Sequence, residues 1–373
     1  MAASRVLTVI LAGLAAALAF ACPASAVDPQ AHTPSLQFLG QAIIPTGTTF
    51  GGTTIGGLSS ITYDPARNVY YALSDDPSQF SPSRFYTFRI DLDGSFDPSD
   101  LHVDRVTTFQ APGGGPYPFG SIDPEGLVLT KDGRLVLTSE GFTNQLVNPF
   151  LRFYDVQGQF LGSLPVPSYF LPTADHASGV RANLAFEPAG VPPNGRFFFT
   201  GTENALFQDG PAATVAGGSP SRLLRYNVQT ERLDRQYVYW TDPVFQAPIP
   251  PTQFSVNGLV ELLPLNNEFL LAMERSFSVG VPGTGNEIKL YEVALPGADD
   301  VNGVAGLAGS LGSIGPAQKT LLLDLGTLGI PLDNVEGMTF GPDLADGRRS
   351  LIMVSDNNFA ASQFTQFLLF ALG

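Results

Sequence analysis

Two acidic motifs that recur along the chain have the residue types of a cation site or an acid–base centre. Segments 123–127 and 334–338 each place a glutamate before a glycine at the start of an apolar run. In both copies the chain continues through an Asp-Gly turn to a second apolar run, which ends on Glu140 in the first copy and on Asp356 in the second. Two copies of this pattern indicate a repeat fold, in which equivalent carboxylates meet in space.

Comparable positions elsewhere in the chain extend this acidic set. The opening positions of the repeats carry Glu125, Glu187 and Glu336, and the ends of the second strands carry Asp75, Glu140, Glu203, Glu274 and Asp356. Like charges held close together raise one another's pKa unless a cation compensates them. We therefore predict that these acids hold a metal ion or form an acid–base centre. Acids at strand ends also cap turns, so a purely structural role stays open for each of them.

Arginine side chains near these motifs add groups that could bind an anion. The guanidinium group is a planar fork that holds a phosphate or a carboxylate in two places. Three arginines are candidates for substrate binding, although each could instead pair with an acidic neighbour: Arg84, Arg181 and Arg275. Carboxylates for a cation and guanidinium groups for an anion would together suit a phosphate ester held through calcium.

The cysteine and histidine content favours calcium over zinc. Cys22 is the only cysteine, and the chain has three histidines. Zinc sites usually use these two residue types, whereas calcium takes oxygen ligands. Because Cys22 falls in a segment that we expect to be removed, the mature chain would also lack disulfides and a thiol nucleophile.

Short strands must position these residues. The chain has 40 glycines and 31 prolines, and short apolar runs alternate with turn residues, as in all-β sandwiches, barrels and propellers. We count five repeats of a four-strand unit and predict a β-propeller of four-stranded blades. Six blades remain an alternative if connection 205–221 or 296–317 contains a divergent one. The last repeat lacks a fourth strand, and the unmatched segment 36–44 is predicted to close the ring beside it.

The first residues have the features of an export signal. Arg5 precedes an apolar run over 6–21, and a small-residue ending at Ala26 follows. This pattern predicts a signal peptide over 1–26, a flexible leader over 27–34 and a single domain over 35–373. A membrane anchor is the alternative, but the run is shorter than the about 20 residues that span a bilayer. A lipid anchor at Cys22 also stays open. We expect a secreted or periplasmic protein.

The charge of the chain limits its partners. It has 34 Asp and Glu residues against 19 Lys and Arg residues. This excess of acid argues against nucleic acid and against anionic membrane surfaces as partners. We expect a monomer that binds a small molecule, with no membrane contact after signal cleavage. The chain has no Gly-x-Ser-x-Gly elbow and no Walker loop.

Several of these segments together resemble a known family. Segments 57–61, 72–76, 123–127, 273–277, 334–338 and 354–359 are similar to the phytase-like family named for "esterase-like activity of phytase". The resemblance extends over roughly residues 50–372, and the third repeat departs from it with Glu187-Pro188-Ala189. It implies an exported, propeller-like protein with phosphoester or ester hydrolase activity.

A more distant similarity to calcium-dependent β-propeller phytases implies attack on phosphate by a metal-activated water. In that hypothesis Glu125, Glu187, Glu336 and Asp356 hold calcium and water, and Glu336 and Glu125 are essential for catalysis. Arg181 and Arg275 would clamp the phosphate. The competing interpretation is a propeller without enzymatic activity that binds a ligand or a protein, because propellers host many unrelated functions. Any calcium would then be structural.

Overall fold

The structure is a computed structural model that describes residues 34–92 and 96–373. The expected signal peptide over 1–26, and the leader up to residue 33, lie outside the described residues. Within these ranges no helix is long and apolar enough to cross a membrane.

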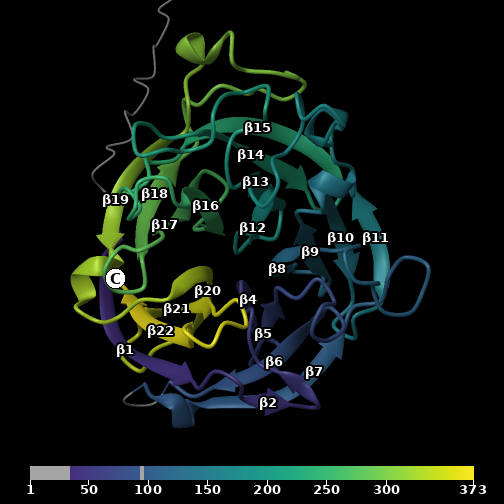
Figure 1. Ribbon diagram of the computed structural model, residues 1–373. Helices are drawn as coiled ribbons and strands as arrows, with labels where there is room; N and C mark the ends of the chain where they lie inside the picture. The colour runs from purple at the N-terminus through teal and green to yellow at the C-terminus, as the bar shows by residue number, and fades with distance from the viewer. Residues whose placement is uncertain (1–33, 93–95) are drawn as a thin grey trace, which may run out of the picture. The chain divides into compact units, whose positions relative to one another are not determined.

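The described chain forms five four-stranded antiparallel sheets around a central channel, which confirms the predicted propeller and its five blades (Figure 1). The first blade contains β4 (Ser60–Asp64), β5 (Val69–Ser74), β6 (Arg84–Ile90) and β7 (Leu101–Thr108). The second contains β8 (Pro124–Leu129), β9 (Leu135–Ser139), β10 (Phe150–Tyr154) and β11 (Phe160–Leu164). The third contains β12 (Phe186–Gly190), β13 (Phe197–Thr202), β14 (Pro220–Asn227) and β15 (Arg232–Trp240). The fourth contains β16 (Ser255–Pro264), β17 (Phe269–Ser278), β18 (Asn286–Ala294) and β19 (Gln318–Asp324). The fifth contains β20 (Asn334–Asp343), β21 (Arg349–Asp356), β22 (Thr365–Leu372) and β1 (Leu36–Ile44).

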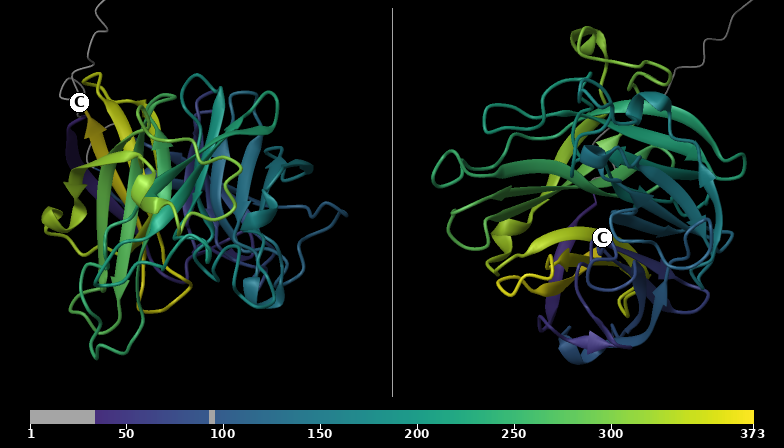
Figure 2. Two further views of the ribbon diagram at one scale, coloured as in Figure 1. Left: turned by 90° about the horizontal axis from the view of Figure 1, so that it is seen from above. Right: turned by 45° about the vertical axis from the view of Figure 1, so that its right-hand side comes forward.

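Few other elements are present in the described chain. A short hairpin joins β2 (Thr49–Phe50) to β3 (Thr53–Thr54). The 3₁₀ turns are η1 (Pro98–Asp100), η2 (Thr143–Gln145), η3 (Ser168–Phe170), η4 (Leu311–Ser313) and η5 (Leu325–Leu328). Turning the molecule by 90° shows the strands of the blades side by side, with loops gathered at their two ends (Figure 2).

The hydrophobic core lies between the blades. Strands in the middle of a blade are covered on both faces by neighbouring blades. Their sequences therefore contain continuous apolar runs, as in β21. Outer strands such as β19 are only half-buried and are more polar. Five apolar clusters fill the five junctions between adjacent blades, and the one between the fifth and first blades includes Ile61 and Phe367. The apolar pattern that predicts the strands therefore also packs the ring.

The N-terminal strand closes the ring as predicted. β1 pairs antiparallel with β22, from Leu36 opposite Leu372 to Ile44 opposite Thr365. The pairing supplies the fourth strand that the last repeat lacks. It also covers the edge of β22, which would otherwise offer free backbone groups to another chain.

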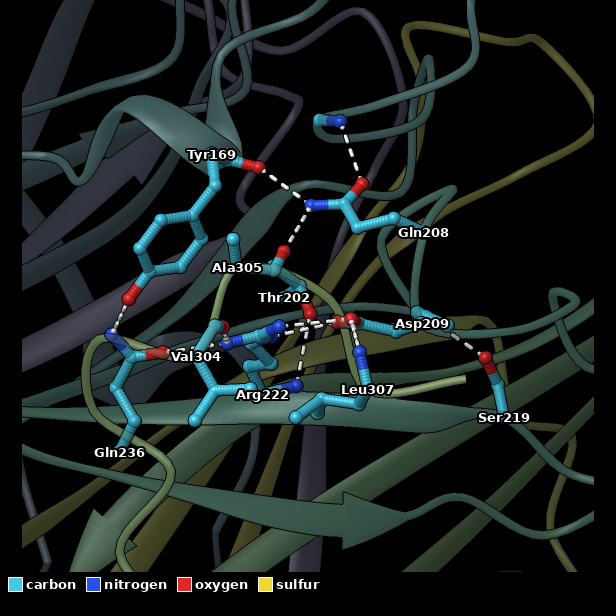
Figure 3. A network of polar contacts seen from close by, with 12 residues as sticks. Tyr169, Thr202, Gln208, Asp209, Ser219, Arg222, Gln236, Val304, Ala305 and Leu307 are labelled. Carbon is cyan, nitrogen blue, oxygen red and sulfur yellow. Dashed lines mark hydrogen bonds and ion pairs between the residues drawn. The ribbon is translucent and has the colours of Figure 1, made fainter. Parts of the chain in front are cut away.

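A buried ion pair fixes the two long connections that were considered for a sixth blade. Arg222 on β14 and Asp209 are fully buried, with 2.6 Å between Arg222 Nε and Asp209 Oδ2. Arg222 also donates to the carbonyl of Val304, at 2.7 Å, and the Leu307 amide donates to Asp209 Oδ1, at 2.9 Å (Figure 3). Both connections are thus folded onto the third blade as loops and contain no further sheet among the described residues.

Candidate functional site

β-Bulges deform four of the five innermost strands at equivalent places. The pairing register shifts between Pro124 and Leu127, Phe186 and Ala189, Leu259 and Glu261, and Val335 and Gly337. The residues inside these shifts include Glu125, Glu187, Val260 and Glu336. A bulge leaves its extra residue unpaired and redirects its side chain. The three predicted opening glutamates are therefore presented by a shared backbone irregularity.

Glycine after the glutamate allows these bulges to pack closely. A methyl group on Gly126 would lie 2.4 Å from the carbonyl oxygen of Glu187 in the next blade. A methyl group on Gly337 would lie 2.8 Å from the Cα of Ser60. The innermost strands of neighbouring blades approach each other at these points, so the Glu-Gly pair has a steric cause as well as a chemical one.

The bulged glutamates face a cavity of about 510 Å³ at one end of the channel. The residues that line it include seven that were proposed from the sequence: Asp75, Glu125, Glu187, Glu203, Arg275, Glu336 and Asp356. They come from all five blades, so the structure brings together most of the residues proposed from the sequence. Glu140 belongs to the same cluster, because its carboxylate oxygen lies within 4.8 Å of oxygens of Glu125 and Glu187.

The ends of the second strands form a ring with one member of opposite charge. In the bulged blades each ring residue pairs with the position two residues before the bulge, as Glu140 does with Asp123 and Asp356 with Asn334. In the first blade, whose innermost strand has no bulge, the Asp75 amide donates to the carbonyl of Gly57. In the fourth blade the position two residues before the bulge is Gly258, and its partner is Arg275. The ring is therefore completed by an arginine.

Glu274 lies outside this ring, because adjacent residues of a strand point to opposite faces. Its carboxylate accepts hydrogen bonds from the Tyr239 hydroxyl at 2.6 Å and the Asp242 amide at 2.8 Å, and it pairs with Lys319. It is buried by its own blade and the preceding one and does not line the cavity. Glu274, which we expected to bind a metal from the sequence, is thus bonded to protein groups within the fold and is not part of the cavity.

Two of the three candidate arginines also have other partners. The buried Arg84 lies 2.7 Å from Asp76 and donates to the Tyr86 hydroxyl at 2.9 Å. Arg181 donates to the carbonyls of Ala205, at 3.0 Å, and Gly210, at 2.7 Å. Neither lines the cavity, so of the three only Arg275 is brought to the acids.

Arg275 is held between two carboxylates. Its Nη2 lies 2.9 Å from Glu336 Oε1 and 3.7 Å from Glu203 Oε1. The Asn334 amide donates to the same Glu336 oxygen at 2.9 Å. Arg275 Nε is buried and has no hydrogen-bond partner in the described part of the chain. Both carboxylates contact Nη2, and the side chain lines the cavity, so the guanidinium keeps donors that these two acids do not occupy.

The acids occupy an environment that opposes their ionisation. Burial, followed by the charge of Asp75 and Glu187, raises the pKa of Glu125 well above its usual range. Burial likewise raises the pKa of Glu203 to about 7 and that of Asp123 to about 6. Desolvation and neighbouring carboxylates together favour the neutral acids, unless a cation restores the balance.

The donor set fits a hard cation. Two groups of three carboxylates have oxygens within 4.8 Å of one another, Asp75 with Asp123 and Glu125, and Glu125 with Glu140 and Glu187. Asp75 Oδ1, Glu140 Oε2 and Glu203 Oε1 are buried without a hydrogen-bond partner among the described residues. Such orphaned oxygens are costly unless something coordinates them. All the donors are oxygens, the ligand type that calcium prefers and structural zinc sites avoid.

Some residues of this region were not proposed from the sequence. Asp123 and Asn334 occur in the recurring motifs, but only their glutamates were assigned. Glu261 was missed, although a single carboxylate in the otherwise apolar run over 259–263 was a usable signal. The aromatic residues Phe254 and Phe277, which also line the cavity, had no distinguishing pattern.

Comparison with known proteins supports the resemblance noted above. The family described as "Phytase-like: Esterase-like activity of phytase" matches residues 53–359. No curated protein matches the chain.

Solved structures with a similar arrangement have little sequence in common with this chain. The endo-arabinase from Bacteroides thetaiotaomicron VPI-5482 has 12% identity and a TM-score of 0.43, over 90% of this chain and 96% of that chain. The tail fiber of Staphylococcus aureus phage P68 has 10% identity and a TM-score of 0.43, over 90% of this chain and 52% of that chain. A protein of unknown function from Dyadobacter fermentans DSM 18053 has 11% identity and a TM-score of 0.39, over 91% of this chain and 100% of that chain. These likenesses carry no argument about function.

Proposed function

Because this chain belongs to the phytase-like family, we propose that it is a calcium-dependent hydrolase of phosphate or carboxyl esters. The observation that carries the proposal is a pair of three-carboxylate clusters that share Glu125. Their members Asp75, Glu125 and Glu187 line the same cavity as the guanidinium of Arg275. A cation site and an anion-binding donor occur together there. This combination suits an ester whose acidic part is negatively charged.

The residues have distinct roles in this proposal. Asp75, Asp123, Glu125, Glu140 and Glu187 would hold the metal, and Glu203 and Asp356 line the same cavity. Calcium, when bound, would supply a Lewis acid that polarises an ester oxygen and lowers the pKa of a water molecule.

Arg275 and Glu336 act on the substrate in this proposal. The guanidinium of Arg275, which lines the cavity, donates to an anionic oxygen of the ester. Glu336 is oriented by Arg275 and Asn334, which both donate to its Oε1, and it accepts a proton from the attacking water. Fixing the carboxylate from two sides keeps it in one rotamer, which favours proton transfer over a defined path.

The activity test uses the full mature chain. Turnover of p-nitrophenyl phosphate, p-nitrophenyl acetate and phytate is measured with calcium and with a chelator, and thermal unfolding is measured in parallel. We expect ester turnover that requires calcium. Glu125→Gln and Glu336→Gln should each remove most of it, whereas Glu268→Gln, at an exposed position of the fourth blade, should retain the wild-type rate.

A different set of results would support the non-enzymatic alternative. If none of the three esters is hydrolysed while calcium still raises the unfolding temperature, the metal is structural and the hydrolase proposal is wrong. If turnover occurs and both Gln variants keep near-wild-type rates, the cavity is not the site of the reaction.

We also propose that the chain is exported to the periplasm or the medium and is a monomer that binds a small molecule. The support is the apolar N-terminal run with its small-residue ending. N-terminal sequencing of the protein recovered from the producing cells should begin at Val27, and light scattering should give the mass of one chain. An uncleaved N-terminus, or a lipid on Cys22, would contradict the export proposal in this form.

A further inference from the structure

The fourth blade contributes a different chemistry to the cavity from the other four. Arg275 and Phe277 are two residues apart on β17, so their side chains share a face of the strand. Phe254 immediately precedes β16 and lies beside Phe277, with 6.3 Å between the ring centroids. Both rings line the cavity. The fourth blade therefore adds a guanidinium and two aromatic rings to a cavity that the other blades line with carboxylates.

One of these rings is open to solvent. Phe254 is 60% exposed. Single exposed apolar residues are common on protein surfaces and need no explanation by themselves. Here, however, the exposed ring and its neighbour converge on a cavity that already contains polar groups for a ligand. An apolar group bound there would cover the rings and remove them from water.

The charges of the cavity limit how much anionic charge a ligand can bring. Arg275 is the only lysine or arginine among the described residues that line it, and its guanidinium already pairs with Glu336. Six carboxylates of the described residues also line the cavity: Asp75, Glu125, Glu187, Glu203, Glu336 and Asp356. One bound anionic group can pair with the guanidinium of Arg275 where it lines the cavity. Further anionic groups on the same ligand would meet carboxylates.

We propose that this site selects an ester with one acidic group next to an aromatic or apolar group, and that it disfavours polyanions with several phosphates. Arg275 binds the acidic group, and Phe254 and Phe277 contact the apolar part. The cavity of about 510 Å³ has the size of a small-molecule site. The inference rests on the proposed function, since it names the substrate class for the same cavity.

Binding of non-hydrolysable probes tests this specificity without any turnover. Phenylphosphonate, methylphosphonate and myo-inositol hexasulfate are titrated calorimetrically into the full mature chain in the presence of calcium. We expect phenylphosphonate to bind roughly tenfold more tightly than methylphosphonate, because contact with two aromatic rings adds to the affinity. The hexasulfate should bind no more tightly than methylphosphonate.

Variants of the aromatic wall complete the test. Phe254→Ala and Phe277→Ala should each weaken phenylphosphonate binding roughly threefold to tenfold and leave methylphosphonate binding unchanged. Phe245→Ala is the matched control, because Phe245 is 52% exposed and lies outside the cavity lining. Thermal unfolding of each variant separates a lost contact from a lost fold.

The outcomes distinguish this inference from the proposed function. Equal affinity for the two phosphonates, tighter binding of the hexasulfate, or no effect of either Phe variant would overturn the inference, even if esters are hydrolysed. The expected binding pattern in a protein that hydrolyses no ester would keep the inference as a ligand site and remove the hydrolase proposal.

Discussion

Glu261 lies buried where the innermost strands of three blades meet, and it offers a quantitative test of the electrostatics of the channel. Its Oε1 accepts hydrogen bonds from the amides of Ala189 and Leu262, both at 2.9 Å, and its Oε2 accepts from the Ser60 hydroxyl at 3.3 Å. The Ala189 amide ends the bulge that presents Glu187. Burial raises the pKa of Glu261 from 4.5 to about 8, and these hydrogen bonds oppose the rise only in part.

The direction of the pH effect follows from this raised pKa. Between pH 4.5 and 8 the folded protein keeps the proton of Glu261 and the unfolded chain loses it. The protonated Glu261 side chain therefore makes its full contribution to stability below pH 4.5, the pKa in the unfolded chain, and this contribution is lost as the pH rises towards 8. The free energy of unfolding falls by about 1.4 kcal/mol for each pH unit in this window, or by about 3 kcal/mol from pH 5.5 to 7.5.

Glu261→Gln removes the titrating group and keeps its shape. Urea unfolding of wild type and variant is measured at pH 5.5, 6.5 and 7.5 in a chelator, so that no metal ion contributes. The amide cannot reproduce every hydrogen bond, and this adds a constant offset. The difference between the two free energies of unfolding should nevertheless rise in favour of the variant by about 1.4 kcal/mol for each pH unit.

Glu268→Gln controls for the loss of a negative charge from the same blade. Glu268 lies exposed in the turn between β16 and β17, and the Glu268→Gln variant is measured over the same pH range to show what the loss of a surface charge does by itself. A constant difference for Glu261→Gln would refute the reasoning, because Glu261 would then ionise equally in the folded and unfolded states. A difference that falls with pH would mean that the folded protein stabilises the charged carboxylate.

Three further predictions concern the packing of the ring and its ligand. Arg222→Met should lower the free energy of unfolding by about 3–5 kcal/mol in urea denaturation, since Asp209 would stay buried without its partner. Adding Asp209→Leu should restore part of this loss, and no recovery would argue against a charge effect. Gly126→Ala should cost about 1–3 kcal/mol, because its methyl group would lie 2.4 Å from the Glu187 carbonyl oxygen, whereas Gly162→Ala meets nothing within 4 Å and should be nearly neutral. Equal losses in the two glycine variants would contradict the steric argument. Arg275→Ala should weaken phenylphosphonate binding at least about tenfold. Arg181→Ala should leave it unchanged, since Arg181 is bonded to two backbone carbonyls. A larger loss of affinity in Arg181→Ala than in Arg275→Ala would show that the anion binds at Arg181 instead.

The sequence predicts the ring because repetition and apolar pattern are local properties. The four-strand repeat, the five blades and the closing strand over 36–44 follow from counting apolar runs between turns, and the pairing of β1 with β22 confirms them. Glu125, Glu187 and Glu336 were also identified, because the bulges that present them repeat as a Glu-Gly or Glu-Pro pair. Local pattern was sufficient for these features.

The rest of the site depends on interactions that no local pattern contains. In the fourth blade a register difference of one residue places Arg275 in the cavity and Glu274 outside it, and that register becomes visible only when β16 and β17 are paired. Arg84 and Arg181 are occupied by partners on distant loops and strands, whose approach depends on the tertiary fold. Glu261 bonds to strands of two other blades for the same reason.

The closure of the ring by β1 also has a consequence for folding kinetics. Leu36 and Leu372 pair although nearly the whole described chain separates them in sequence. Such distant contacts form slowly, because their loop-closure entropy must be overcome before they stabilise the fold. The blade that they complete also carries Glu336 and Asp356. The cavity should therefore be among the last parts of the molecule to assemble, and ligand or metal binding would report on complete folding.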